Sequence, residues 1–238
     1  MFKKNSSIIK LNNMNQDLLP DSGPNPRVYM ELSADNKVIG TLKIKLFREV
    51  FPAGVENFLG MIRGDTEKIT EYGISKYKYS KHHKRSFKGC KFYNMMHNNY
   101  FVTGDIYKNN GDSSGTIFDD MPIIADFGDY FYPHDAKGLI SLVPFRDADT
   151  GDIYYDSVFM ITLDSAKSTN VMAELDKDQI VIGEVYEGIN FLDDMNKMIF
   201  PAANRTYPVF SITNCGVQKD NTRNTKIKYP SDPNKKIY

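Results

Sequence analysis

The segment FKGCKFYNMMHNNYFVTGD, residues 87–105, is decisive for the fold of this chain, and its composition is also typical of a functional site. Aromatic residues stand on both sides of the polar sequence HNN at residues 97–99. Asparagine favours turns because its short amide side chain bonds to nearby backbone and tolerates left-handed conformations. The pattern therefore predicts a strand and a turn, although the same residue types would also suit a wall of a binding site.

Alternating apolar residues indicate antiparallel β-structure in much of the remaining chain. Val28, Met30 and Leu32 alternate with other positions in RVYMELS, residues 27–33, and TLKIKLF repeats the pattern after a turn at ADNKVIG. This predicts a hairpin with one buried face. Four later runs are short, rich in β-branched residues and bounded by turn residues, and we expect strands there too: GLISLV (138–143), SVFMIT (157–162), QIVIGEV (179–185) and YPVFSIT (207–213).

Two segments have helical spacing instead. Apolar residues recur every three or four positions in residues 51–64, where Pro52 stands near the start and Gly64 follows the end. INFLDDMNKMI, residues 189–199, shows the same spacing. Many strands, two helices and no strand-helix-strand rhythm predict an α+β, mainly β fold, in which an antiparallel sheet closes into a barrel and the helices cover its ends.

Composition limits the classes of partner. The 238 residues include 30 basic and 30 acidic side chains, so attraction to nucleic acid or membrane would need a local patch. The start MFKKNSSIIKLNN has no apolar stretch behind its lysines, and we expect an intracellular rather than a secreted protein. Cys90 and Cys215 are expected to be reduced, with a disulfide between them as the alternative. Polar composition predicts extensions over residues 1–25 and 219–238 around a folded domain, 26–218.

The order of these elements resembles the cyclophilin family. NPRVYMELSADNKVIGTLKIKLFREVFPAGVENF is similar to its opening hairpin and first helix, and FKGCKFY with Gly104-Asp105 resembles its Y-K-G-x-x-F-H and G-G-D segments. GLISLV, SVFMIT, LDKDQIVIGEVYEGINFLDDM and ITNCGV resemble the later strands and second helix. The resemblance covers roughly residues 26–217 and implies a cyclophilin-like eight-stranded antiparallel β-barrel capped by two helices.

The family's usual activity is cis/trans isomerisation of the peptide bond before proline, without a metal or cofactor. Amide resonance gives this bond a barrier of about 18–20 kcal/mol. An apolar slot for the proline ring and a donor aimed at the prolyl nitrogen lower it. The family's donor is an arginine, and here that position is Asn94. Charge-assisted hydrogen bonds contribute roughly 1.5–3 kcal/mol against about 1 for neutral ones, so losing the arginine is expected to cost about one to two orders of magnitude in rate.

The resemblance also assigns a substrate groove in which most positions depart from the family. Asn99 stands at the position of the slot's phenylalanine, although a one-residue slip at Asn98-Asn99 would place Tyr100 there instead. Pro144 cannot donate a backbone N–H to a bound peptide. The full set of expected groove positions is Asn99, Tyr100, Val102, Val143, Pro144, Ser157, Phe159, Glu174, Leu175 and Gln179, of which only Phe159 and Leu175 keep the family's residue. We therefore expect weak or absent isomerase activity.

Several segments fall outside this resemblance. Tyrosines alternate with basic residues in TEYGISKYKYSKHHKRSFKG, so nucleic-acid binding through residues 72–88 is an alternative to a solvated loop or a protein contact over 65–86. His82-His83 lack a cluster of further metal ligands, and Asp126-Phe127-Gly128 lacks the other kinase motifs. DADTGDIYYDSV, residues 147–158, lacks the closing glutamate of a calcium loop and is expected to form a long surface hairpin.

The sequence thus predicts a cyclophilin-type protein with a degenerate site and a peptide-binding, protein-binding or structural role. A slow isomerase that assists protein folding and a nucleic-acid-binding protein are the alternatives. The expected partners are proline-containing peptides or protein clients, and the polar extensions with the insert 165–174 are candidates for contacts in a homo-oligomer. Zero net charge disfavours nucleic acid, and we expect no membrane partner.

Overall fold

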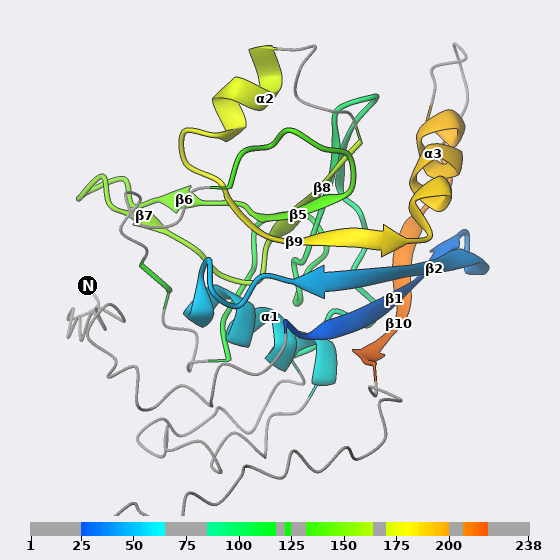
Figure 1. The fold of residues 1–238 in the computed structure, drawn as a ribbon, viewed down its shortest axis with the longest axis horizontal. Helices are drawn as coiled ribbons and strands as arrows, with labels where there is room; N and C mark the ends of the chain where they lie inside the picture. Colours follow the sequence, from blue (N-terminus) through cyan, green and yellow to red (C-terminus); the bar gives the residue numbers. More distant parts are fainter. Residues whose placement is uncertain are drawn as a thin grey trace, which may run out of the picture.

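Strands provide most of the regular structure in residues 25–64, 85–117, 122–124, 132–163, 170–199 and 207–218, which are the parts that the computed structural model describes (Figure 1). The strands are β1 (Arg27–Ala34), β2 (Lys37–Leu46), β3 (Asn94–Met96), β4 (Tyr100–Thr103), β5 (Leu139–Leu142), β6 (Phe145–Arg146), β7 (Ile153–Tyr154), β8 (Phe159–Thr162), β9 (Ile180–Glu187) and β10 (Phe210–Val217). The helices are α1 (Pro52–Arg63), α2 (Asn170–Leu175) and α3 (Ile189–Met198).

One antiparallel sheet contains eight of these strands, in the order β10-β1-β2-β9-β5-β8-β4-β3. Its two edges meet where residues 89–92, which lead into β3, pair with β10. The backbone N–H of Phe92 donates to the carbonyl of Phe210 over 3.0 Å, and that of Ile212 donates to Cys90 over 2.9 Å. These bonds close the sheet, which confirms the predicted β-barrel.

The opening hairpin forms as its alternating pattern predicts. Val28, Met30 and Leu32 are fully buried, and the turn between β1 and β2 places Asp35 and Asn36 at φ angles of 47° and 64°. Both residue types tolerate this left-handed backbone, which matches the twist of a tight hairpin. The turn is also tied to the chain just before β10, because the backbone N–H of Asp35 donates to the carbonyl of Val209 over 3.0 Å.

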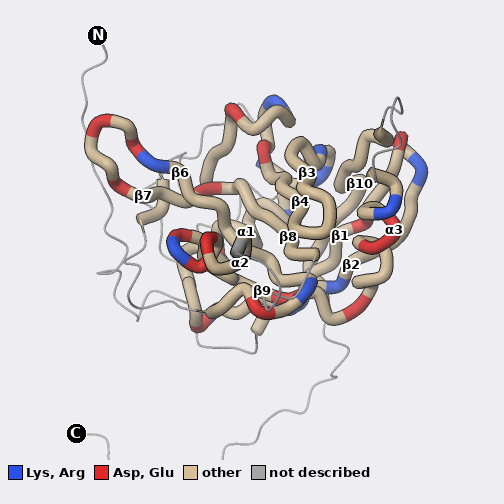
Figure 2. Tube along the Cα trace, turned by 90° about the horizontal axis from the view of Figure 1, so that it is seen from above, with Lys and Arg blue, Asp and Glu red and all other residues tan. Residues whose placement is uncertain are grey.

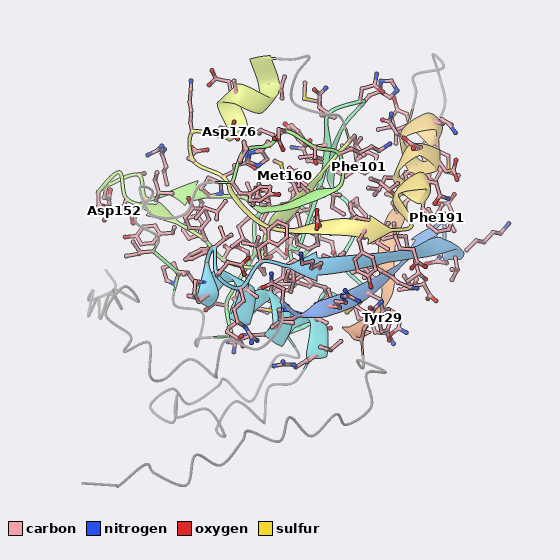
Figure 3. All side chains as sticks on the ribbon, in the orientation of Figure 1. Tyr29, Phe101, Asp152, Met160, Asp176 and Phe191 are labelled. Carbon is pink, nitrogen blue, oxygen red and sulfur yellow. The ribbon has the colours of Figure 1, made fainter. Side chains whose placement is uncertain are left out.

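Both predicted helices are present. Pro52 lies in the first turn of α1, and Gly64 ends it in the left-handed conformation with a backbone bond to Gly60 over 3.0 Å. α3 packs on β2 by placing Phe191 over Gly40, where an added Cβ would lie 2.3 Å from the ring (Figure 3). Gly40 therefore permits this close approach.

The structure differs from the sequence prediction at the ends of several strands and by one additional helix. The last strand begins at Phe210 rather than at residue 207, because the pairing with β1 runs from Phe210 to Val217. The six-residue helix α2 was not predicted, and it occupies the end of the polar insert 165–174. The predicted extensions lie outside the described residues except for Asn25, whose side-chain oxygen accepts the backbone N–H of Arg48 over 3.2 Å.

A buried carboxylate organises the loop that follows β4. Asp105 is fully buried, and its two oxygens accept backbone N–H groups over distances between 2.8 and 3.3 Å. The donors are Tyr107, Lys108, Asn110, Gly111 and Ser113. Burial by itself would raise the pKa of Asp105, but the backbone donors outweigh it and hold the pKa well below its usual range. The charged form of Asp105 is therefore part of the fold.

Replacing Asp105 with Asn should lower the free energy of unfolding by about 2 kcal/mol at neutral pH, since a charged acceptor becomes neutral. The wild-type contribution should be complete above about pH 4 and should decline as the pH falls further, because the folded pKa is lowered. Urea unfolding from pH 2 to 7 measures both. Asp112→Asn, on the exposed part of the same loop, should change stability by less than about 0.5 kcal/mol.

The core inside the barrel is built around three phenylalanines. Phe58 of α1, Phe87 and Phe159 of β8 pack together with ring centroids 4.8 to 5.0 Å apart, in tilted and edge-on geometry. All three are at most 1% exposed. This packing joins the first helix to the centre of the sheet.

Phe159→Ala should therefore lower the free energy of unfolding by about 3–5 kcal/mol, through lost burial and a cavity. Phe145→Ala is the matched control, because Phe145 is 42% exposed and should cost less than about 1 kcal/mol. Chemical unfolding of both variants checks the prediction. Similar losses in the two would show that the three rings do not form the centre of the core.

Candidate functional site

The alternation of β8 decides which side chains can line a site on the outside of the barrel. Phe159 and Ile161 point into the core, so Val158 and Met160 lie on the opposite face. The groove role expected for Phe159 is therefore wrong. Moving the match to the family by one residue along a strand exchanges the side chains of its two faces. Met160, the next residue of β8, therefore lies on the face where the site was expected.

An apolar cluster lies on this outer face, and we call it the β4–β8 patch. Its members lie on β4, β8 and α2 and next to the ends of β3, β5 and β8, and they are Tyr93, Tyr100, Val102, Val143, Val158, Met160 and Leu175. Val102 and Met160 are directly opposite each other on β4 and β8, which places the patch across two adjacent strands. The structure thus brings together four of the predicted groove residues, Tyr100, Val102, Val143 and Leu175.

The position of the family's arginine lies at the edge of this patch. Asn94 is exposed on β3 and pairs directly with Val102 on β4. Val102 has no polar group that could orient a donor at position 94. A side chain there therefore receives no support from its nearest cross-strand neighbour.

Asn99 and Tyr100 are the two alternatives for the aromatic position of the slot, and the hairpin turn between β3 and β4 decides between them. Asn99 lies in this turn, and its side-chain amide donates to the carbonyl of His97 over 2.9 Å. Tyr100 begins β4 and belongs to the patch. Tyr100 rather than Asn99 therefore supplies an aromatic ring at this position.

Ser157 and Glu174 point away from the patch, contrary to the sequence prediction. Ser157 is buried, and its hydroxyl donates to the carbonyl of Gly104 over 2.7 Å, so it joins two loops inside the molecule. Glu174 is exposed and forms an ion pair with Lys177. The next residue, Leu175, turns inward to the patch because successive residues of a helix face different directions.

The last two predicted positions flank the patch. Pro144 is half-buried between Val143 and β6. Gln179 is half-buried, and its backbone N–H donates to the carbonyl of Leu175 over 3.0 Å. The side-chain oxygen of Gln179 is buried without a hydrogen-bond partner among the described residues. Neither residue is a member of the apolar cluster.

A buried polar network supports the patch from behind, and sequence reasoning missed it. His134 Nδ1 lies 2.6 Å from Asp176 Oδ1, and His134 Nε2 lies 2.9 Å from Ser141 Oγ. Ser141 pairs with Met160 across β5 and β8, and Asp176 directly follows Leu175. The network therefore holds the backbone next to two members of the patch, Met160 and Leu175 (Figure 3). Because His134 and Ser141 are fully buried, we assign them a positioning role.

The charge state of this network should control stability at mildly acidic pH. Burial lowers the pKa of His134 more than the neighbouring Asp176 raises it. Unfolded chains therefore bind a proton at about pH 6.5 that the folded protein takes up only at lower pH. The His134 contribution to stability is thus complete above about pH 6.5 and is lost as the pH falls below it.

His134→Gln should remove this slope below about pH 6.5, while it lowers stability at neutral pH. Urea unfolding at several pH values measures the slope. His97→Gln is the control, and it should retain the slope because it leaves the buried network intact. A slope that persists unchanged in His134→Gln would assign the acid sensitivity to another group.

The cysteines are both free thiols, which decides against the disulfide alternative. Burial raises the pKa of Cys90 to about 12, so its unreactive thiol form predominates at neutral pH. Within the described ranges, no group of three His, Cys, Asp or Glu side chains is placed to hold a metal ion. No helix in the same ranges is long and apolar enough to cross a membrane.

The remaining sequence predictions concern segments at the surface. Residues 147–152 form the turn between β6 and β7, as expected for a surface hairpin. Tyr154, Tyr155, Asp156 and Ser157 are at most 8% exposed, so the end of the predicted surface segment is buried instead. Arg85, at the end of the basic insertion, is 1% exposed, and its Nε donates to the hydroxyl of Tyr107 over 3.3 Å. This residue is therefore not part of a basic surface. Residues 72–84, which include His82-His83, and Asp126-Phe127-Gly128 lie outside the described residues.

The fold and the patch correspond to a known family. The family model for cyclophilin type peptidyl-prolyl cis-trans isomerase/CLD matches residues 29–217. The chain belongs to the cyclophilin family, as its sequence motifs predicted.

Individual relatives refine this placement. The chain is 56% identical over 205 residues to the structural PPIase-like protein L605 of Acanthamoeba polyphaga mimivirus, covering 86% of this chain and 87% of the relative. It is 30% identical over 202 residues to the peptidyl-prolyl cis-trans isomerase CYP26-1 of Arabidopsis thaliana, covering 82% and 72%. The crystal structure of the mimivirus cyclophilin superposes with a TM-score of 0.71 at 52% identity, covering 84% of this chain and 92% of that one.

Proposed function

We propose that this chain is a cyclophilin-family module that binds peptide or protein segments and has weak or no isomerase activity. The observation that carries the proposal is the pair formed by Asn94 and Val102. The family resemblance implies an arginine donor at the first position and a glutamine that orients it at the second, and this chain has an amide and an aliphatic side chain there. Isomerisation needs a donor for the prolyl nitrogen in the transition state. Binding of an extended apolar segment needs only apolar contact with the β4–β8 patch.

The chemistry of the β4–β8 patch supports binding. Five of its seven side chains are aliphatic, and the other two, Tyr93 and Tyr100, add hydroxyl groups. Burial raises the pKa of Tyr93 to about 12, so its hydroxyl remains protonated at neutral pH and can donate to a peptide carbonyl. A neutral donor of this kind contributes about 1 kcal/mol, which assists binding but does not replace the charged arginine.

The name of the viral relative is consistent with this proposal. It describes the mimivirus protein as structural and as PPIase-like, and 56% identity makes a similar role plausible for this chain. Under the same proposal the protein acts inside a host cell or as part of a particle. Its clients would be protein segments, and its polar extensions would offer contacts for self-association.

A slow isomerase that assists folding is the second candidate function. The observation in its favour is that Val102, Met160 and Leu175 still form a contiguous apolar cluster at the expected position of the proline slot, where they are 2% to 7% exposed. A proline ring would contact this cluster mainly through its partly buried members, Tyr93, Tyr100, Val143 and Val158. The difference between the two functions therefore lies in the rate of isomerisation.

With a short peptide that contains Ala-Pro, we expect kcat/KM to be about 10- to 100-fold below that of an active cyclophilin assayed in parallel, since the charged donor is lost. Asn94→Arg alone should raise the rate less than about tenfold, because Val102 cannot orient the new guanidinium. Asn94→Arg combined with Val102→Gln should raise it further. Asn190→Arg, an exposed change on α3, is the control and should have no effect.

Ordinary cyclophilin rates in the wild-type chain would contradict both the proposal and the second candidate, because both expect the loss of the charged donor to slow the reaction. Comparison of peptides that contain Ala-Pro or Ala-Ala provides an independent measurement. Equal affinity for the two, together with no gain of activity in the double variant, would show that the patch binds extended segments without selecting proline.

A further inference from the structure

The hairpin formed by β6, the turn 147–152 and β7 projects from the rim of the β4–β8 patch, and we call it the β6–β7 arm, residues 145–154. Within the described residues, its two strands pair only with each other and form a separate sheet from the eight-stranded one. Both Figure 1 and Figure 2 show it extending away from the barrel on the side opposite α3. At the base of the arm, the backbone N–H of Val143 donates to the carbonyl of Val158 over 3.1 Å, and both residues belong to the patch.

The arm presents an exposed aromatic surface. Phe145 stacks on Tyr154 with ring centroids 5.5 Å apart and an angle of 27° between the planes. Tyr154 is only 8% exposed, whereas Phe145 is 42% exposed. One face of the Phe145 ring therefore covers Tyr154, and the side chain offers much of its remaining surface to solvent or to a ligand.

The charges around this ring are mostly negative. Residues 145–154 contain three aspartates and one arginine, and Figure 2 shows the acidic positions along the projecting turn. The guanidinium of Arg146 lies 3.4 Å from the carboxylate of Asp178, at the base of the arm rather than in the turn. An exposed aromatic ring beside carboxylates is complementary to a Lys or Arg side chain, which gains from cation–π contact and from charge attraction.

We propose that the β6–β7 arm binds the cationic flank of an extended partner segment whose apolar part occupies the β4–β8 patch. The inference rests on the proposed binding function of the patch. Phe145 follows Val143 of the patch by two positions, and two residues of extended chain span about 7 Å, so the arm begins directly beside the patch. A segment that continues from the patch toward the arm would place its next side chains near Phe145. The patch supplies affinity for an apolar segment, and the arm selects segments that carry positive charge beside it.

Two pairs of fluorescein-labelled peptides test this proposal against the full chain. All four contain Gly-Ser-Ala-Pro-Leu-Gly. In one pair this core is followed by Lys-Arg-Lys or by Glu-Gln-Glu, and in the other pair it is preceded by them. Fluorescence polarisation at low salt should show about fivefold tighter binding of the cationic peptide in one of the two orientations, and 0.5 M NaCl should reduce this preference. Phe145→Ser and Asp149→Lys should each reduce the preference to less than about twofold.

Asp194→Lys provides the matched charge reversal, because Asp194 lies on α3, away from the arm, and should leave the preference unchanged. Equal binding of the cationic and acidic peptides, lost in Val143→Arg at a half-buried position of the patch, would overturn the role of the arm and retain that of the patch. Failure of all four peptides to bind would overturn the two proposals together. Sedimentation velocity adds a further test, since an oligomer that dissociates in Phe145→Ser would assign the arm to a second copy of this chain.

Discussion

The packing of Phe159 between Phe58 and Phe87 is the constraint on which both the core and the site depend. The three rings join α1 to β8, and they are almost completely buried. Because side chains alternate along a strand, the inward position of Phe159 places Met160 on the outer face. The interaction that stabilises the barrel thus also determines the composition of the β4–β8 patch.

Buried polar networks hold the segments around this patch, and their side chains do not form part of its surface. Asp105 orders the loop after β4 through backbone donors, and His134 joins β5 to the residue that follows α2. Both carboxylate and imidazole are stabilised by partners inside the protein, as buried polar groups require. The geometry of the patch therefore also depends on residues outside it, and the exposed Asn94 can change while the fold persists.

Sequence predicted the elements whose patterns are local and failed where long-range packing decides. The alternation of β1 and the Pro52 and Gly64 signals of α1 identified these elements, because each pattern reflects a single buried face. SVFMIT is apolar at four consecutive positions, so it shows no alternation, and only the contacts of Phe159 with α1 reveal its register. The link between His134 and Asp176 spans 42 residues and leaves no local pattern. The family resemblance located Tyr100, Val102, Val143 and Leu175, since these positions follow from ordered motifs.

An apolar patch with neutral donors presents a problem of selectivity, because many extended segments can bury a few aliphatic side chains on it. Hydrophobic contact depends on area and carries little directional information. Charged groups near such a surface add selectivity at a modest cost in affinity, since they favour one class of partner and repel another. The β6–β7 arm is suited to this role because its base shares Val143 and Val158 with the patch, which fixes the position of Phe145 and the acidic turn relative to any segment bound there. Under the proposed function, a cyclophilin fold with Asn94 at the expected position of the arginine would in this way keep a defined partner, and it would discriminate through the residues beside the prolyl nitrogen.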